Sequence, residues 1–290
     1  MKDLSQITVI GLGLVGGSIT LATLRCLSGV KVVGYTHRAA TRRRARQLAV
    51  ATEIADDMAE SVSKADLVII ATPVCTFEET FEVIADALPA GCIVTDVGST
   101  KVLANRWASK KLRKTSYYVG SHPIAGSEQR GIEFARDDLF ERTTCILTTT
   151  RKTNHKAVQT VKRFWSSLGC SVKLMTPVQH DRILANVSHV PHIVAAALIN
   201  ASDSKELKFA GTGFIDTSRV ASGPANIWAD VLLTNANNAT KGIDKIGAEL
   251  AKLKTAIRTQ DRGQIEKLLE KARNKRKALV KYKMRRDELI

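Results

Sequence analysis

Glycines near the start of the chain have the spacing of a dinucleotide-binding loop. Gly11, Gly13 and Gly16 form a G-x-G-x-x-G pattern, with apolar residues 7–10 before it and a helix-like stretch after it. The first glycine of such a loop permits a tight turn, the second lets the backbone approach a pyrophosphate, and the third allows close helix packing. We therefore predict a cofactor site formed by Gly11, Leu12, Gly13, Leu14, Val15 and Gly16.

The residues after the second apolar run bear on which dinucleotide binds. An acidic residue about 20 positions beyond the glycines would bind the ribose 2′-hydroxyl of NAD, but here no carboxylate occurs before Glu53. Hydroxyl and basic side chains stand there instead, and they suit a 2′-phosphate: Thr36, His37, Arg38 and Thr41. We predict NADP over NAD, with NAD still possible; the alternative is that this loop is simply exposed and basic.

A histidine and a serine follow two later apolar runs, where catalytic groups would lie. His122 comes directly after residues 117–120, and Ser99 lies in the segment that follows residues 93–96. Ligands of an open α/β sheet bind beyond the carboxyl ends of its strands, so both should face the cofactor. An imidazole at this position could remove a hydroxyl proton while a hydride leaves the carbon. The pattern favours a hydroxyl-oxidising site.

The elements that position these residues form two patterns. Short apolar runs at 7–11, 31–35, 67–71, 93–96, 117–120, 145–149 and 172–175 alternate with helix-like stretches, which predicts a doubly wound parallel sheet of the Rossmann type. From residue 177 onward only helical spacing remains, including one long helix over 180–202 that Pro191 should kink. We predict an α/β dinucleotide-binding domain at 1–176 and an all-helical domain for substrate binding and dimerisation at 177–290.

Composition limits the class of protein. The 290 residues are 44% hydrophobic, carry a formal net charge of +16 and include 18 glycines. We find no apolar run of about 18 residues and no secretory signal, so we expect a cytoplasmic protein without membrane segments. Five well-separated cysteines without a Cys-x-x-Cys pair fit reduced, buried thiols.

The basic excess raises the alternative of nucleic-acid binding. Residues 241–290 contain 16 Lys+Arg against 7 Asp+Glu, a net of +9, but they hold only one aromatic residue, Tyr282. Nucleic-acid modules combine charge with a reading motif or interleaved aromatics. A solvated helix face is the simpler interpretation, so we expect no nucleic-acid partner. Trp165 and Trp228 are expected in the core.

Five segments together resemble the prephenate/arogenate dehydrogenase family. They are GLGLVGGS, DVGSTK, GSHPIAGSE, HDRILANVSHVPH and GTGFIDTSRVAS, in family order from residue 7 to about 235. The resemblance implies oxidative decarboxylation of a cyclohexadienyl substrate, prephenate or arogenate, in tyrosine biosynthesis. No metal is needed, because aromatisation drives the loss of the carboxylate. It also implies a homodimer, for which apolar stripes between Ile243 and Ala272 could supply the interface, or else an intrachain core.

The resemblance implies roles for particular residues. His122 is the catalytic histidine, and Ser99 orients it together with the substrate hydroxyl. Arg219 pairs with a substrate carboxylate, and the cleft histidines His189 and His192 contribute to substrate binding. The family role of His180 is more peripheral.

Several alternatives stay open. Ser99 could be a helix N-cap, Arg219 a surface ion pair, and the two cleft histidines packed core residues. Ile215 stands where many relatives carry a basic residue, which puts a second anion contact there in doubt. Other readings of the whole chain are a hydroxyacid or imine reductase of the same two-domain plan, or a non-catalytic dinucleotide-binding protein. The sequence does not decide between prephenate and arogenate.

Overall fold

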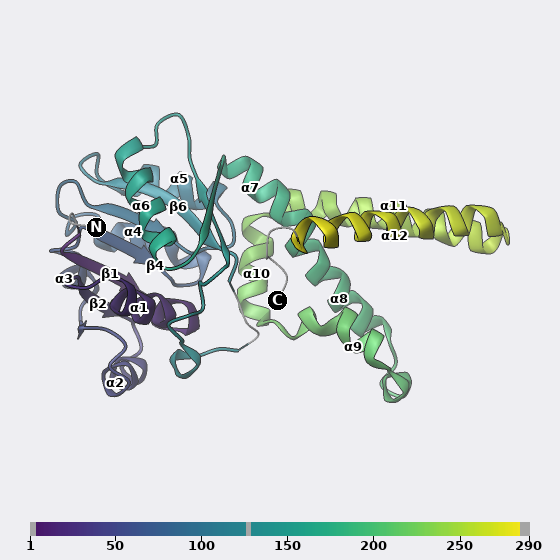
Figure 1. Ribbon diagram of the computed structural model, residues 1–290, viewed down its shortest axis with the longest axis horizontal. Helices are drawn as coiled ribbons and strands as arrows, with labels where there is room; N and C mark the ends of the chain where they lie inside the picture. The colour runs from purple at the N-terminus through teal and green to yellow at the C-terminus, as the bar shows by residue number, and fades with distance from the viewer. Residues whose placement is uncertain (1–3, 126–128, 285–290) are drawn as a thin grey trace. The chain divides into compact units, whose positions relative to one another are not determined.

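The computed structural model describes residues 4–125 and 129–284, and it contains two compact units, Met1–Asn235 and Ala236–Ile290. The larger unit holds the sheet together with helices from the segment 177–235 (Figure 1). The smaller one is a helical hairpin. The functional division predicted after residue 176 is a separate matter and stays a prediction.

One eight-stranded sheet forms the centre of the larger unit. Its strand order is β3-β2-β1-β4-β5-β6-β7-β8, and every neighbouring pair is parallel except β6 and β7. This confirms the doubly wound, mostly parallel sheet. The strands are β1 (Gln6–Ile10), β2 (Lys31–Tyr35), β3 (Glu53–Ile54), β4 (Leu67–Ile70), β5 (Ile93–Asp96), β6 (Tyr117–Pro123), β7 (Thr144–Thr148) and β8 (Ser171–Met175).

Helices cover both faces of this sheet. Alternate residues of β4 belong to two separate buried clusters, Leu67 and Ile69 to one and Val68 and Ile70 to the other, as expected for a strand covered on both sides. The first cluster packs against α1 (Leu14–Cys26), α2 (Ala39–Gln47) and α6 (His155–Ser167). The second packs against α3 (Met58–Val62), α4 (Phe77–Ile84) and α5 (Val102–Lys111).

The long helical segment after β8 is continuous but irregular. It runs as α7 (Pro177–Leu184), a π-helical turn at Ala185–His189, and α8 (Val190–Ala201). Pro191 is the second residue after the π turn, and a proline both lacks an N–H and crowds the preceding turn, so a wider turn relieves it. The irregularity predicted at Pro191 is therefore present, as a π-helical turn just before it. Two further helices complete the unit, α9 (Thr212–Ser218) and α10 (Ala225–Thr234).

The same segment corrects the expectation that nothing in the chain is long and apolar enough for a membrane. Pro177–Ala201 spans 25 residues with a mean hydropathy of 1.4 over its most apolar window. Length and composition alone are weak evidence, because the core helix of a globular domain meets the same criteria. Here one third of that window is buried, and Asp181 within the helix is buried and accepts hydrogen bonds from backbone N–H groups at the start of α5.

Three further expectations are corrected. β3 has only two residues, too few to show a periodicity, and the sequence analysis misses it. Cys26 and Cys75 are exposed rather than buried, although all five cysteines are free thiols. Trp165 is buried as predicted, whereas Trp228 is half-buried and stacks on His192 with ring centroids 3.6 Å apart.

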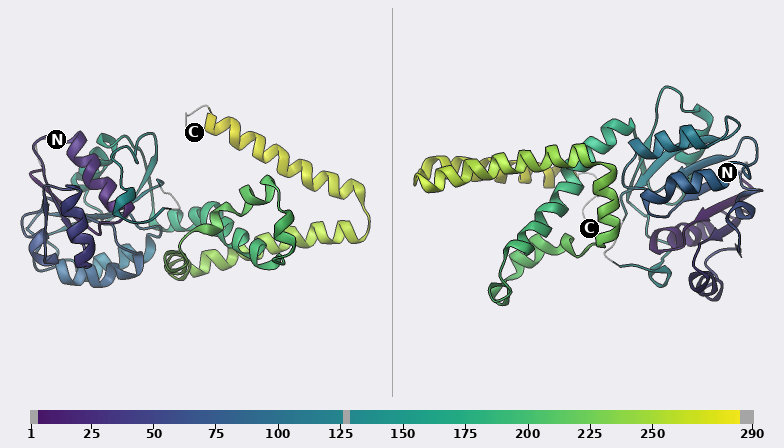
Figure 2. Two further views of the ribbon diagram at one scale, coloured as in Figure 1. Left: turned by 90° about the horizontal axis from the view of Figure 1, so that it is seen from below. Right: turned by 180° about the vertical axis from the view of Figure 1, so that it is seen from behind.

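The smaller unit consists of α11 (Ala236–Arg258) and α12 (Arg262–Met284), joined by a short turn. The two helices separate with distance from that turn (Figure 2), so neither covers the whole apolar stripe of the other. Large apolar side chains are consequently exposed within the single chain: Ile243, Ile246, Leu250, Ile257 and Leu269.

Candidate active site

The glycine loop is closed on one side and open on the other. Gly11 has a φ of +101°, and a Cβ there would lie 2.7 Å from the carbonyl of Ala71. A Cβ on Gly16 would lie 1.8 Å from the oxygen of Gly11, whereas one on Gly13 would meet nothing within 4 Å. No side chain caps the N-terminus of α1. Open space beside free helical N–H groups fits the pyrophosphate of a dinucleotide.

A cavity of about 1060 Å³ extends from this loop. It reaches past the end of β2 on one side and to Ser99 on the other. Nine of the ten predicted cofactor residues line it, all but the buried Gly16: Gly11, Leu12, Gly13, Leu14, Val15, Thr36, His37, Arg38 and Thr41. The volume is ample for a dinucleotide and a small substrate.

Two arginines of α2, the helix that follows β2, make different contacts. Arg44 lines the cavity beside Thr41, and the sequence analysis did not select it. Arg42 instead donates hydrogen bonds to the carbonyls of Thr36 and His37, at 2.8 and 3.0 Å, and pairs with Asp56. Arg42 therefore shapes the loop, while Arg38 and Arg44 present charge to whatever occupies it.

His122 lies within a strand rather than in the loop after one. β6 pairs with β5 only as far as Val119, and then continues to Pro123 as an antiparallel partner of β7. The residue pattern predicts a strand that ends at residue 120, because a change of pairing partner leaves no mark in that pattern. The extension carries His122 past the carboxyl end of β5, where the segment containing Ser99 begins. Residues 126–128 of the GSHPIAGSE motif lie outside the described residues.

A buried chain of hydrogen bonds leads away from His122. Its Nδ1 lies 2.9 Å from Nε2 of His180, and Nδ1 of His180 lies 2.8 Å from Oδ1 of Asp181. His180 and Asp181 are almost wholly buried. His180, expected from the resemblance to be more peripheral, therefore contacts His122 directly. The only sequence feature that could have indicated this contact is the His-Asp pair at the start of an apolar helix.

Asp181 also organises the segment that carries Ser99. Its two carboxylate oxygens accept hydrogen bonds from the backbone N–H groups of Lys101 and Val102, at 2.7 and 2.9 Å. Those groups begin α5, whose own N-cap residue makes no side-chain cap. Ser99 is therefore not the helix N-cap that was considered as an alternative, because Asp181 performs that task.

A fully buried ion pair lies beneath the same segment. The ammonium of Lys101 contacts the carboxylate of Asp96, which also accepts hydrogen bonds from the hydroxyl of Tyr118 at 2.6 Å and the N–H of Gly98 at 2.7 Å. Buried charges of this kind are tolerated only when their partners are complete. The pair fixes both ends of the turn that presents Ser99, and the sequence analysis assigned it no role.

The two cleft histidines occupy different surroundings. His189 is buried, and its Nδ1 lies 3.3 Å from the side-chain amide of Asn235, which also donates to the carbonyl of Asp181. His192 is stacked on Trp228. Among the described residues, Nε2 of His189 and Nδ1 of His192 are the buried side-chain polar atoms without a hydrogen-bond partner. Such atoms suit contacts with a polar ligand.

Arg219 and Ser99 are more accessible to solvent than the buried His180 and His189. Arg219 begins a short 3₁₀ turn, Arg219–Ser222, that packs against α8, and its side chain is exposed. Ser99 is half-buried and lines the cavity. Within the described part of the chain, no hydrogen bond joins Ser99 to His122; the bond that orients His122 comes from His180.

Burial keeps the histidines of this cluster neutral. Loss of solvation, with the nearby charge of Lys101, lowers the pKa of His122 well below its ordinary range. Burial also lowers the pKa of His180, although its bond to Asp181 acts in the opposite direction, and lowers the pKa of His189 to about 4. The cluster therefore offers an unprotonated imidazole at neutral pH, as general-base chemistry requires.

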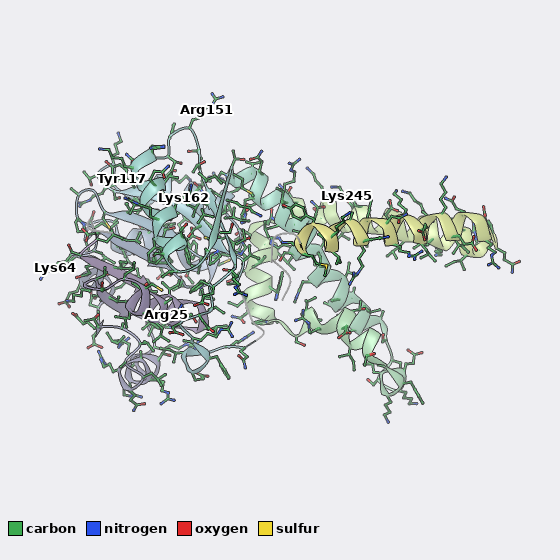
Figure 3. All side chains as sticks on the ribbon, viewed as in Figure 1. Arg25, Lys64, Tyr117, Arg151, Lys162 and Lys245 are labelled. Carbon is green, nitrogen blue, oxygen red and sulfur yellow. The ribbon has the colours of Figure 1, made fainter. Side chains whose placement is uncertain are left out.

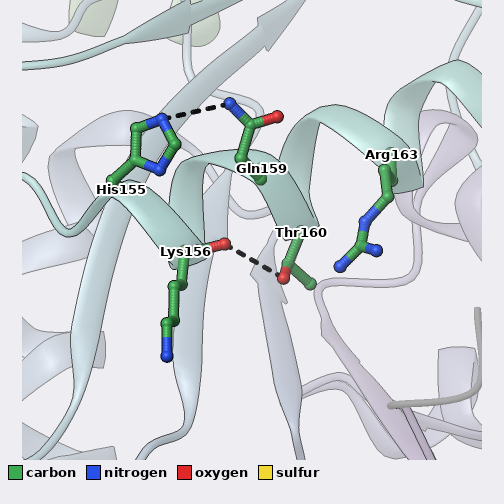
Figure 4. Close-up of a pocket in the computed structure, with 5 residues that line it drawn as sticks. All are labelled: His155, Lys156, Gln159, Thr160 and Arg163. Carbon is green, nitrogen blue, oxygen red and sulfur yellow. Dashed lines mark hydrogen bonds between the residues drawn. The ribbon is translucent and has the colours of Figure 1, made fainter.

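A second hollow and several basic side chains belong to other elements. A shallow hollow of about 480 Å³ on α6 is lined by His155, Lys156, Gln159, Thr160 and Arg163 (Figure 4), none of which was selected from the sequence. Basic side chains such as Lys64, Arg151, Lys162 and Lys245 project from separate elements (Figure 3).

Comparison with known proteins decides the family. The model "Prephenate dehydrogenase, nucleotide-binding domain" matches residues 19–174, and "Prephenate dehydrogenase, dimerization domain" matches residues 176–271. The chain belongs to the prephenate dehydrogenase family. The resemblance seen in the sequence is confirmed, and the cavity and histidine cluster described above are those of a prephenate dehydrogenase family member.

Relatives within the prephenate dehydrogenase family align over nearly the whole chain. Prephenate dehydrogenase of Bacillus subtilis is 34% identical over 96% of this chain and 76% of its own length. Cyclohexadienyl dehydrogenase of Zymomonas mobilis is 33% identical over 99% of both chains. The crystal structure of Aquifex aeolicus prephenate dehydrogenase with hydroxyphenyl propionate and NAD+ superposes with a TM-score of 0.89, at 32% identity over 96% of this chain and 99% of that one.

Proposed function

We propose that this protein catalyses the oxidative decarboxylation of prephenate or arogenate, with hydride transfer to NADP+, in tyrosine biosynthesis. The observation that carries the proposal is His122, a neutral imidazole at the end of β6, in a chain of the prephenate dehydrogenase family. The proposal also draws on relatives named prephenate and cyclohexadienyl dehydrogenases. A solved neighbour that contains NAD+ supports a nicotinamide dinucleotide as cofactor.

His122 acts in this proposal as the general base. Nε2 of His122 removes the proton of the substrate ring hydroxyl. The nicotinamide cofactor, when bound, supplies the acceptor for the hydride that leaves the ring carbon bearing this hydroxyl. The ring carboxylate then leaves as carbon dioxide, and its electron pair completes the aromatic ring. A low pKa keeps His122 unprotonated in the resting enzyme, so the base is ready whenever substrate arrives.

Other residues bind and orient the substrate. We assign Ser99 to the substrate hydroxyl, because it lines the cavity at the end of β5. Arg219 pairs with a substrate carboxylate. His189 and His192 supply the buried nitrogen atoms that have no partner in the protein, and these suit the polar groups of the substrate side chain.

The preference for NADP rests on the loop after β2. Thr36, His37, Arg38, Thr41 and Arg44 line this end of the cavity, and no carboxylate follows the strand where NAD enzymes place one. Hydroxyl, imidazole and guanidinium groups suit a 2′-phosphate. NAD remains the alternative, and NAD+ is the dinucleotide in the solved neighbour.

We also propose that the enzyme is a cytoplasmic homodimer. Its match to a dimerization domain extends to residue 271, and α11 exposes Leu250 and Ile257 at about 60% in the single chain. Burial of such apolar area drives association. Light scattering should give twice the mass of one chain, and Leu250→Lys should shift it toward the monomer. A monomeric wild type would exclude the dimer.

The first experiment is a rate assay with four reactions. Prephenate and arogenate are each tested with NADP+ and NAD+, and the rise in absorbance of the reduced nicotinamide is recorded. We expect turnover of at least one substrate with NADP+ at a higher kcat/KM than with NAD+. Turnover only with NAD+ would overturn the cofactor assignment alone. No turnover from folded protein that binds NADP+ would favour the hydroxyacid or imine reductase, or the non-catalytic alternative.

A further inference from the structure

A chain of hydrogen bonds from His122 through His180 to Asp181 has no role yet in the proposed reaction. It joins three side chains by hydrogen bonds of 2.9 and 2.8 Å, and it links β6 to the start of the long helical segment. We propose that His180 and Asp181 are positioning residues that fix His122 in one tautomer, with the proton on Nδ1 and the lone pair on Nε2. This inference rests on the proposed function of His122 as a base.

The protonation of each group follows from its partners. Oδ1 and Oδ2 of Asp181 accept hydrogen bonds from the backbone N–H groups of Lys101 and Val102, and Oδ1 also lies 2.8 Å from Nδ1 of His180. We take Asp181, held by these two N–H donors, as the ionised carboxylate, which can only accept. Nδ1 of His180 must then be the donor toward Asp181.

The remaining nitrogen atoms follow in turn. In a neutral imidazole one nitrogen carries the proton and the other accepts, so Nε2 of His180 accepts. The burial that lowers its pKa keeps His180 neutral. Nδ1 of His122, 2.9 Å away, must therefore donate, and the lone pair of His122 is left on Nε2. A histidine without this partner would populate both tautomers, and one of them cannot act as base at Nε2.

A purely structural role is the competing explanation for the same contacts. Asp181 caps α5, so His180 could serve only to hold that carboxylate in place. The two explanations differ in which nitrogen of His180 matters. Holding Asp181 needs the donor at Nδ1, whereas fixing the tautomer of His122 needs the acceptor at Nε2.

Two substitutions separate these functions. His180→Asn keeps an amide nitrogen near the position of Nδ1, so the bond to Asp181 survives, but nothing replaces Nε2. His180→Gln reaches the position of Nε2 with an amide oxygen that can accept from His122, and it loses the donor to Asp181. Our proposal predicts that Gln preserves the function of His122 better than Asn does, and a structural role predicts the opposite order.

The decisive measurement is nitrogen-15 NMR of the histidine rings in the free enzyme, which distinguishes the two tautomers directly. The chain has only six histidines, and the signals of His122 are assigned by their loss in His122→Asn. We expect the Nδ1–H tautomer in wild type and in His180→Gln, and a mixture of tautomers in His180→Asn. An unchanged Nδ1–H tautomer in His180→Asn would overturn the proposal.

Kinetics give the second readout. We expect kcat to fall by about 100-fold in His180→Asn and by much less in His180→Gln, with KM for the nicotinamide cofactor unchanged. The matched control is Asp57→Asn, which weakens an exposed helix cap on α3 and should leave both readouts unchanged. Equal losses of kcat in the two His180 variants would contradict the proposal. Because the NMR result needs no substrate, failure of the proposed reaction would appear separately, as inactive wild type with a fixed tautomer.

Discussion

The histidine cluster and the cofactor cavity are built in opposite ways. In the cluster, hydrogen bonds of 2.9 and 2.8 Å join His122 to His180 and His180 to Asp181, and the last two side chains are buried. In the cavity, Arg38 and Arg44 belong to the lining beyond β2 and are exposed. Polar groups withdrawn from water must satisfy one another, which fixes a single geometry, whereas exposed charges act through a screened field. Substitution of one residue in the histidine cluster should therefore lower kcat strongly. Removal of one exposed arginine should weaken NADP+ binding only slightly.

The largest effect should come from removing the base. His122→Asn eliminates the lone pair that takes the hydroxyl proton, so we expect kcat to fall on the order of 10³-fold. Binding of the nicotinamide cofactor should be unchanged, because the glycine loop is remote in sequence and keeps its own contacts. Initial rates and a fluorescence titration with the reduced cofactor would measure the two quantities. Near-normal turnover would remove His122 from the mechanism, and His155→Asn on the exposed face of α6 is the matched control.

The fold was predictable because its signals are local. Apolar runs such as 67–71 give a strand covered on both faces, and the glycine loop locates the first strand of the sheet. Both features can be recognised from a few consecutive residues, without knowing which strands or helices lie beside them. Glu53–Ile54 was missed because two residues carry no period, and β6 was ended too early because its last residues pair with a different strand.

The site was only partly predictable, since its buried contacts join distant residues. His122 and His180 are 58 residues apart, and Lys101 and Asp181 are 80 apart. Motif spacing selected His122 and Ser99, but an aspartate beside a histidine on a helix has no local mark of burial. Arg44 was missed for the opposite reason, because exposed arginines on α2 look alike until the cavity distinguishes them.

A second test of the histidine cluster uses stability rather than rate. The pKa of His189 is lowered to about 4 by burial, so the folded protein resists a proton that the unfolded chain accepts below about pH 6.5. The unfolded state binds more protons in this window, and stability must fall as the pH drops from 6.5 toward 4. For His189 alone the loss is about 2 kcal/mol at pH 5.

Urea unfolding at pH 7.5 and pH 5 would measure this. His189→Gln should lose less stability between the two pH values than wild type does, by about that amount. His155→Gln, which alters an exposed histidine, should reproduce the wild-type pH dependence. An identical pH dependence in His189→Gln and wild type would show that His189 is not held neutral by the fold.

Arg219 is an intermediate case between the buried cluster and the exposed arginines of the cavity. It is assigned to a substrate carboxylate, yet its side chain is exposed. Arg219→Ala should therefore raise KM for the substrate about 10-fold with kcat nearly unchanged, less than a fully buried pair would give. Steady-state kinetics would measure this, with Arg182→Ala as the exposed control. An unchanged KM would assign the carboxylate elsewhere.

The smallest effects are expected from the exposed arginines that line the cofactor cavity. Arg38→Ala and Arg44→Ala should each weaken NADP+ binding about fivefold, because exposed ion pairs contribute about 1 kcal/mol or less. Binding of NAD+, which lacks the 2′-phosphate, should hardly change. Arg43→Ala is the matched control, since Arg43 is exposed on the same helix and does not line the cavity. Arg42 is unsuitable, because it holds the loop through the carbonyls of Thr36 and His37.

Salt separates a charge effect from a change of shape. If Arg38 and Arg44 act through their field, raising the ionic strength should weaken NADP+ binding in wild type and diminish the difference between wild type and the two variants. Titration calorimetry at low and high salt would measure both. Parallel losses of NADP+ and NAD+ affinity would instead mean that the arginines maintain the loop itself. In that case the two arginines would act by fixing the geometry of the loop, as the buried residues of the histidine cluster fix His122, and not through a screened charge.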